Sequence, residues 1–582
     1  MQYHCCINSC CCFVGPHAKW ETCPYCDEPW YNSTRKPRKQ FTYLPIIPRL
    51  VALFKNPEYA KLMQYRGQFV SDPEIITNIF DSSLYIEQLK EYVTVDGKRL
   101  QHKFFQDLRE IALGLSTDGF APFRRWKHTC WPIILFNYNL PPDVWFHLEH
   151  ILCVAVILGP KKPKDFDSFL WPLVQELLQL QLGTCCFDTL ANELFPLRAH
   201  LIQAFGDIPA VSMLMQMKGH NGKTPCRMCH IQGLRIPDSG ATTHYVPLDR
   251  SHHPLVRNKP SIIQKYDGAN LPLQTHEEFL RQAQEVQSAM TDADAEWLSK
   301  EYGIKGVLLL SHLSSLKFPA SFPYGFMHLI YENVLKNLVA LWTGQFKGLD
   351  EGTGSYKLMP KVWEAIGAAT AAAGSSVPGA FGVRPRNVAD DKTTCTADMW
   401  SFWMLYIRPV LLNQKFQRQV YYDHFIELVK LVNLCLQFEI TKAQISELRD
   451  GFQWWVERYE EWVLFNYLCP FTDTSLRLYY QYSPDHLATC PLTVHALLHI
   501  ADGIEACSPV WAYWEFAMER YCGHLQPAIK SRCYPYPSID NYVVANTQLT
   551  QIKMCYNLQD TLSLKAPKNE VLRGSYSHPS CK

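Results

Sequence analysis

Three apolar runs of strand length follow one another near the start of the chain: IALGLST (111–117), WPIILFNYN (131–139) and ILCVAVIL (151–158). The first run ends directly at Asp118-Gly119, a pair of turn residues. Residues 165–182 then carry apolar side chains at helical spacing, and a further strand is expected over 197–206, just before Asp207. The predicted order is therefore strand, strand, strand, helix, strand.

This is the order of the first elements of an RNase H-like core, an α/β fold in which the first and fourth strands lie side by side. Asp118 follows the first predicted strand and Asp207 follows the fourth. The two carboxylates are therefore expected to be neighbours although 89 positions (207 minus 118) separate them.

Composition narrows the class of protein. The 582 residues are 47% hydrophobic and 19% charged, which excludes disorder on the scale of the chain. Lys plus Arg number 56 against 55 Asp plus Glu, so a polyanion must be bound through local basic patches. We expect no membrane span, because no apolar run reaches about 18 residues. The candidate patches are Arg35–Lys39, Arg124–Lys127 and Lys161–Lys164.

Seven cysteines lie in the first thirty residues, and no secretory signal precedes them, which favours metal binding over disulfides. Cys6 with Cys10 and Cys23 with Cys26 form two close pairs, which allows four thiolates to converge on one Zn²⁺. We predict a small zinc ribbon. A cysteine-rich leader without a fixed metal is the alternative, and the neighbouring Cys5, Cys11 and Cys12 leave the register of the first pair open.

A second metal site is predicted from two distant pairs. Cys226 and Cys229 form a CxxC, and His495 and His499 are spaced to share one helix face. Each pair alone has an ordinary interpretation, a redox dithiol or a plain helix face. Together they predict one zinc that joins the two ends of a mostly helical region. A hydrolytic role for this zinc is unfavourable, because four protein ligands leave no position for water.

Longer phrases of the sequence resemble the CACTA-type (En/Spm) DDE transposases, particularly the fungal TNPD-like members. The phrases include LGLSTDGFAPF (113–123), FGDIPAVSMLMQMKGHNGKTPCRMC (205–229) and CPLTVHALLHIADGIEACSPVWAYWEFAMERYCG (490–523). The resemblance implies an RNase H-like catalytic core in which Asp118, Asp207 and Glu519 are the catalytic acids. It also implies terminal inverted repeats and target DNA as partners, a homo-oligomeric transpososome and a nuclear location.

The residue types support that chemistry independently. Three carboxylates in one cleft repel one another unless cations neutralise them, and oxygen ligands select Mg²⁺ or Mn²⁺. Two such ions can activate a nucleophile and stabilise the leaving oxygen of a phosphodiester. Glu332 is a rival third acid, since His328 is four residues before it and related sequences carry an Asp where this chain has Gly325; Glu515 is another.

Six segments are expected along the chain. They are a zinc ribbon with basic linker (1–40), a helical connector (41–106), the first part of the core (107–210), an all-α insertion (211–490), the zinc clasp with the last catalytic helix (491–535) and a C-terminal tail (536–582). Within the insertion, 365–379 is expected to be flexible, and Thr441 with Gln444 resembles a capping box.

One departure from the family pattern bears on activity. Residues Trp462–Leu478, WVLFNYLCPFTDTSLRL, stand where related sequences pass almost directly to the next segment. They are more typical of translated intron than of designed structure. We expect this insert to strain the clasp and weaken strand transfer, so a catalytically inactive, transposase-derived DNA- or protein-binding protein is the alternative function.

Overall fold

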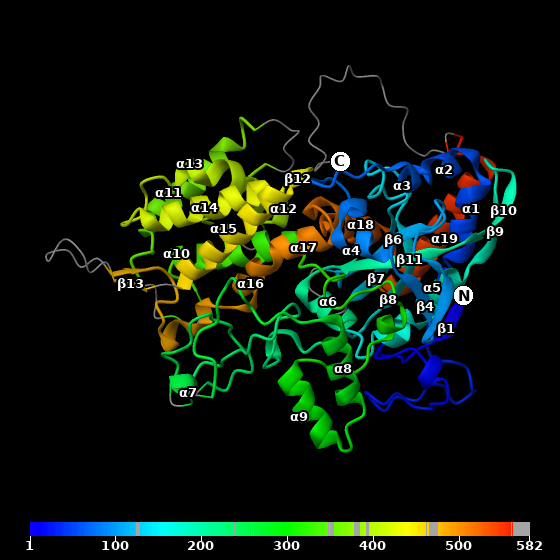
Figure 1. The fold of residues 1–582 in the computed structure, drawn as a ribbon, viewed down its shortest axis with the longest axis horizontal. Helices are drawn as coiled ribbons and strands as arrows, with labels where there is room; N and C mark the ends of the chain where they lie inside the picture. Colours follow the sequence, from blue (N-terminus) through cyan, green and yellow to red (C-terminus); the bar gives the residue numbers. More distant parts are fainter. Residues whose placement is uncertain are drawn as a thin grey trace.

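The computed structural model describes residues 1–582 except 124–128, 238, 258, 260, 347–348, 350–353, 378–383, 391–394, 461, 465–474, 560 and 563–582. Its central sheet has four strands in the order β11-β6-β7-β8 (Figure 1). Their bounds are Ile111–Thr117 for β6, Cys130–Asn137 for β7, Leu152–Leu158 for β8 and Ala199–Phe205 for β11.

The first and fourth strands of the predicted core are neighbours, as expected. β11 runs parallel to β6, while β6, β7 and β8 form an antiparallel meander. Phe205 lies opposite Ser116 in this register. β6, β7 and β11 are buried along their whole length, which explains their continuous apolar runs.

Three helices pack around the sheet. α5 (Asp167–Leu182) contacts β11, and α19 (Pro535–Tyr556) contacts both β8 and α1 (Ile47–Lys55). Asn56 donates a hydrogen bond to the Met554 carbonyl at 2.7 Å, which ties α19 to the turn after α1. The segment expected as a C-terminal tail therefore begins with a long helix that belongs to the core (Figure 1).

The connector before the sheet is only partly helical. Besides α2 (Pro57–Leu62), α3 (Tyr65–Gln68) and α4 (Ser83–Gln88), it contains a hairpin of β4 (Tyr92–Val95) and β5 (Lys98–Lys103). Asp96 and Gly97 join the strands with φ of 49° and 74°. An Asp-Gly pair with two positive φ angles is a preferred hairpin turn, so the sequence contained a signal that the helical prediction missed. A second hairpin, β9 (Thr184–Asp188) with β10 (Glu193–Leu197), was also not predicted.

Periodicity predicted most helices of the insertion, but it did not predict the first of them, and the stretch expected over 275–302 is divided into two helices. The bounds are α6 Ile208–Leu214, α8 His276–Gln287, α9 Asp292–Tyr302, the π-helical η5 His328–Val334, α10 Leu335–Trp342, α12 Ala397–Phe402, η8 Trp403–Ile407, α13 Arg408–Leu411, α14 Val420–Cys435 and α15 Lys442–Glu460. The capping box is confirmed: the Thr441 amide donates to Gln444 at 2.9 Å, and the Gln444 amide donates to the Thr441 hydroxyl at 3.2 Å.

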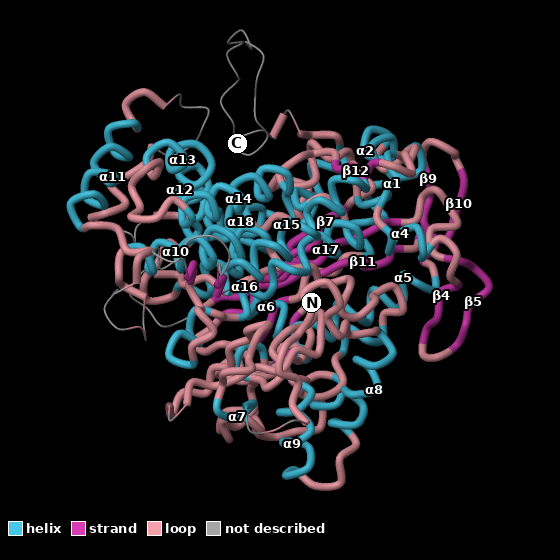
Figure 2. The backbone as a smooth tube through the Cα atoms, turned by 60° about the vertical axis from the view of Figure 1, so that its left-hand side comes forward, coloured by secondary structure: helices cyan, strands magenta, loops and turns pink. Residues whose placement is uncertain are grey.

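Two parts of the insertion differ from the prediction. Among the described residues from 222 to 275, the only helix is α7 (Pro254–Arg257), so this stretch is mostly loop (Figure 2). Conversely, α11 (Pro360–Ala373) is a helix where a flexible connection was expected. Alanine is the strongest helix former, and the small-residue composition was misinterpreted as a linker.

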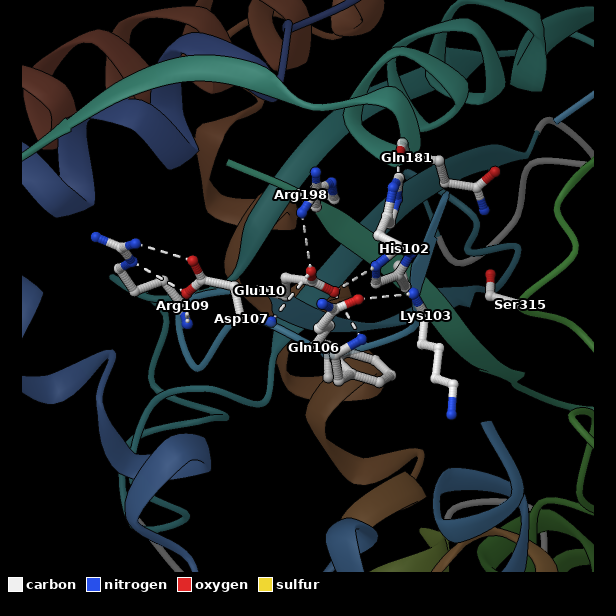
Figure 3. A network of polar contacts seen from close by, with 12 residues as sticks. His102, Lys103, Gln106, Asp107, Arg109, Glu110, Gln181, Arg198 and Ser315 are labelled. Carbon is white, nitrogen blue, oxygen red and sulfur yellow. Dashed lines mark hydrogen bonds and ion pairs between the residues drawn. The ribbon is translucent and has the colours of Figure 1, made fainter. Parts of the chain in front are cut away.

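The end of the sheet away from Asp118 is held by a buried carboxylate (Figure 3). Glu110, 1% exposed, directly precedes β6. It accepts hydrogen bonds from the Phe105 amide at 2.6 Å, from His200 on β11 at 3.1 Å and from Arg198 at 3.2 Å. Burial raises the pKa of Glu110, but the contacts with His200, the Asp107 amide and Arg198 outweigh it and leave the pKa lowered.

Replacing Glu110 by Ala is expected to reduce the free energy of unfolding by about 3 kcal/mol, because His200 and Arg198 lose a buried anionic partner. Denaturant unfolding measures this loss. Because the pKa is lowered on folding, the contribution is present above about pH 4 and disappears as the pH falls further. The difference between wild type and Glu110→Ala should therefore shrink in acid, and a difference independent of pH would contradict this assignment.

Within the described residues, the helices include none that combines the length and apolar character needed to cross a membrane.

Candidate active site and metal centres

Asp118 and Asp207 lie at the same edge of the sheet. Asp118 is two residues beyond Ser116 on β6, and Asp207 is two residues beyond Phe205, the partner of Ser116 on β11. Asp207 is also the N-cap of α6, where its Oδ1 accepts from the Ala210 amide at 2.6 Å. The parallel register of two buried strands therefore brings both carboxylates to one place.

Asp118 lies in an environment that disfavours its charge. Burial raises the pKa of Asp118 to about 8, and the nearby carboxylates of Asp207 and Glu519 contribute to the shift. The Gly119 amide donates to Asp118 at 2.6 Å. Trp131 packs so closely on Gly119 that a Cβ there would lie 2.4 Å from the indole, which holds this turn in position. The site therefore favours a cation.

Glu519, on α18 (Phe516–Leu525), lies at the same site. Its side chain is 46% exposed. Its Oε1 lies 3.7 Å from Nε2 of His328. Asp118, His328 and Glu519 offer ligand atoms that all lie within 4.8 Å of one another, while Asp207 is outside this closest group. The arrangement is compatible with a divalent metal. Sequence reasoning noted His328 only as the neighbour of Glu332, and its spacing gave no sign that it would face Asp118.

The rival acid Glu332 is engaged elsewhere. It accepts from Nδ1 of His328 at 3.0 Å and from Lys336 at 3.1 Å. The hydrogen bond from His328 lowers the pKa of Glu332 to about 2, against the effect of burial and with help from Lys336. Burial lowers the pKa of His328, but Glu332, Glu515 and Asp118 outweigh it and raise it to about 10. Glu332 therefore orients His328 rather than joining the acidic group.

The second predicted metal site is assembled from both ends of the insertion. His495 ends α16 (Leu492–His495), and His499 ends the short 3-10 segment η10 (Ala496–His499). Cys226 Sγ lies 3.5 Å from His499 Nε2, Cys229 Sγ 3.2 Å from His495 Nε2, and the two Nε2 atoms are 3.3 Å apart. Tetrahedral zinc ligands lie about 3.3–3.8 Å from one another, so the buried donor set fits Zn²⁺. We call these four residues the clasp.

The four cysteines predicted for the N-terminal site also converge. Cys6, Cys10, Cys23 and Cys26 offer sulfur atoms within 4.8 Å of one another, and Cys6 Sγ lies 3.5 Å from Cys26 Sγ. This grouping favours Cys6 and Cys10 as the first pair, and Cys11 is also close, with its Sγ 3.9 Å from that of Cys23. A Cys₄ set of this kind is compatible with Zn²⁺.

The three basic runs differ in how far their positive side chains are already engaged in contacts within the protein. In the first run, Lys39 donates to Ser9 and the Leu158 carbonyl, and Arg38 pairs with Glu28 at 2.6 Å, so these two serve the fold. Residues 124–127 of the second run lie outside the described part of the chain. Lys162, in the third run, lies 5.1 Å from the ring centre of Trp131, beside the acidic site.

A lysine that the sequence did not single out joins the third run. Burial lowers the pKa of Lys305, and the charges of Lys162, Lys218 and Lys164 lower it further. Lys162, Lys164 and Lys218 therefore each lie near Lys305, although Lys218 is also paired with Glu296 at 3.1 Å. Repulsion among the lysines favours an anion here, such as a phosphate.

The two ends of the insert, Trp462–Leu478, lie next to each other in the fold. β13 (Trp462–Leu464) pairs with β14 (Ser475–Arg477), while 465–474 and the side chains of 462–477 lie outside the described residues. The amides of Tyr479 and Tyr480 both donate to the Tyr459 carbonyl, at 3.2 and 3.4 Å. The clasp ligands converge with the insert in place, so the expected strain on the clasp is not seen.

Part of the chain matches a known protein family. Residues 90–286 match the family described as Transposase family tnp2. This range contains Asp118, Asp207, Cys226 and Cys229, and it stops short of His328 and Glu519. No curated protein matches the chain significantly. The match supports a transposase family and suggests transposase function, and such a family implies DNA binding.

Proposed function

We propose that the chain is a DDE transposase of the CACTA (En/Spm) type that acts in the nucleus on the terminal inverted repeats of its element. The observation that carries this proposal is the meeting of Asp118, Asp207 and Glu519 from three distant parts of the sequence. The strand order β11-β6-β7-β8 agrees with the order expected for an RNase H-like core, which supports the same assignment. The family match over residues 90–286 includes the first two acids.

Each residue of the proposed site has a distinct task. Asp118, Asp207 and Glu519 would hold Mg²⁺ or Mn²⁺, and His328 could join them only after losing the proton on its Nε2. Those ions supply charge neutralisation and a nucleophilic oxygen for phosphodiester cleavage and strand transfer. Glu332 holds His328 by its Nδ1, so that Nε2 faces Glu519. Lys162 and Lys305 would bind the phosphates beside the cleavage point.

The two cysteine-containing sites are proposed to be structural zinc sites. The clasp offers four protein ligands, all of them buried. Four ligands complete a tetrahedral zinc site, so no position remains for substrate. Cys226 and Cys229 follow Asp207 along the chain, and His495 and His499 precede α18, so the clasp joins the segment after Asp207 to the segment before the helix that carries Glu519. The clasp therefore supports the acidic site without taking part in chemistry.

Whether this copy is active is a separate question, on which the insert bears. Deleting Trp462–Leu478 is expected to leave the fold intact, because the amides after the insert already bond to the carbonyl of Tyr459. Because the family pattern lacks this insert, we expect strand transfer to increase even though the clasp geometry is intact with the insert present. We expect a small loss of Tm, because the deletion removes Leu478, which is 2% exposed and belongs to the core. Equal rates with and without the insert would show that it does not limit activity.

The proposed function is tested by incubating the full chain with a duplex that carries the element's own ends, in Mg²⁺ or in EDTA. Metal-dependent breaks at the ends support transposase activity. If both the full chain and the chain without Trp462–Leu478 bind the ends but do not cut them, the inactive DNA-binding alternative is favoured.

A further inference from the structure

The helix that presents His328 begins without a capping side chain of its own. Its helical residues start at Phe326, and the Gly325 carbonyl accepts the first intrahelical hydrogen bond, from Leu329 at 3.1 Å. Gly325 is therefore the N-cap, a position usually filled by Ser, Thr, Asp or Asn. Its φ is not among the positive values of the chain, so the backbone does not require glycine here.

A carboxylate from another helix occupies the place of the missing side chain. A Cβ built on Gly325 would lie 1.3 Å from Oε1 of Glu515. Oε2 of Glu515 accepts from the Met327 amide at 3.1 Å, the bond that an N-cap side chain makes with the second helical residue. Glu515 is 1% exposed, and among the described residues no group hydrogen-bonds to its Oε1.

This carboxylate also connects the two helices that contribute to the acidic site. Glu515 is the N-cap residue of α18, and its carbonyl accepts from the Glu519 amide at 3.0 Å. His328 follows Met327 directly, in the first turn of the capped helix. A single side chain thus holds the amino ends of both helices together, where their dipoles favour negative charge.

We propose that Glu515 is a positioning residue of the acidic site: it caps the helix of His328 in place of a side chain at position 325 and so sets His328 against Glu519. The role of the cap stands on the contacts of Glu515 alone, and its effect on metal binding rests on the proposed function. Gly325 is then required because Glu515 fills its side-chain space.

The test is a double-mutant cycle in the full chain, with Glu515→Ala, Gly325→Asp and the combination of both. Each single change should lower Tm by at least about 2 °C. The first removes the cap, and the second forces a Cβ against the carboxylate and adds a like charge. In the combination, the new aspartate can cap its own helix in the vacated space. That Cβ would still lie 2.8 Å from the Gly206 carbonyl, so we expect more than half of the lost Tm to return.

Mn²⁺ affinity, followed by electron paramagnetic resonance below the Tm of every variant, is the readout that a merely structural role would leave unchanged. Glu515→Ala should weaken it about tenfold or more, as expected when support for a ligand is lost. The combined variant should recover most of it. Glu447→Ala, an exposed acid on α15, is the matched control and should change neither quantity.

A combined variant whose losses equal the sum of the single losses would overturn the proposal. Glu515→Gln guards against a single change that prevents folding, since its amide oxygen can still accept from Met327. It should keep most of the Tm that Glu515→Ala loses, and equal losses would also refute the cap. Wild-type protein that binds no Mn²⁺ would refute the proposed metal site, while the Tm cycle would still decide the role of Glu515.

Discussion

Asp118→Asn is expected to abolish DNA cleavage, by at least about a thousandfold, while the protein stays folded. Losing an anionic ligand removes several kcal/mol of transition-state stabilisation, and each 1.36 kcal/mol is tenfold in rate. Stability should change in the opposite direction. The half-buried carboxylate is repelled by Asp207 and Glu519, so the variant should have an unchanged or higher Tm in EDTA.

Cleavage of a duplex carrying the element's ends and thermal melting measure the two effects side by side. Asp96→Asn is the matched control, because Asp96 lies in the exposed turn between β4 and β5, where Asn is equally suitable. Loss of activity together with a lower Tm would indicate that Asp118 supports the fold and would contradict a catalytic role. The substitution is therefore made in whichever form of the chain cleaves DNA, the full chain or the chain without Trp462–Leu478.

The second large effect is expected at the clasp. Cys229→Ser should reduce the zinc content from two ions to one per chain and lower Tm strongly. Structural zinc contributes about 10–16 kcal/mol of apparent folding free energy in small zinc peptides. The clasp should also affect the acidic site, because the Tyr324 hydroxyl lies 3.4 Å from Cys226 Sγ and Tyr324 directly precedes Gly325.

Cys533→Ser is the control for the clasp, since Cys533 is exposed and belongs to neither cysteine cluster. Metal analysis of the purified chain and calorimetry measure the effect. A Cys229→Ser variant that retains two zinc ions per chain would exclude the clasp as a metal site.

Local patterns predicted most of the core because the signals there are strong. Continuous apolar runs gave β6, β7 and β8, and the chain order placed the first and fourth strands together. The clasp was predictable because zinc ligands have fixed types and spacings. The Asp96-Gly97 hairpin was missed only because the neighbouring segments are helical.

Other features depend on contacts that no local pattern records. His328 lies beside Asp118 and Glu519, which are far away in the sequence, and a His-to-Glu spacing of four says nothing of those neighbours. The role of Gly325 is invisible without Glu515, which is 190 positions away (515 minus 325). The helix α11 was missed for a different reason, since a run of small residues, mostly alanine, occurs in both helices and linkers.

The central claim, that the carboxylates of Asp118, Asp207 and Glu519 hold divalent cations, is tested most directly by anomalous diffraction from crystals of the full chain grown with Mn²⁺. The account predicts manganese peaks beside Asp118, Asp207 and Glu519, which disappear in Asp118→Asn while the zinc peaks at both cysteine sites remain. Manganese absent from this site in crystals whose zinc sites are filled, or peaks unchanged in Asp118→Asn, would contradict the account.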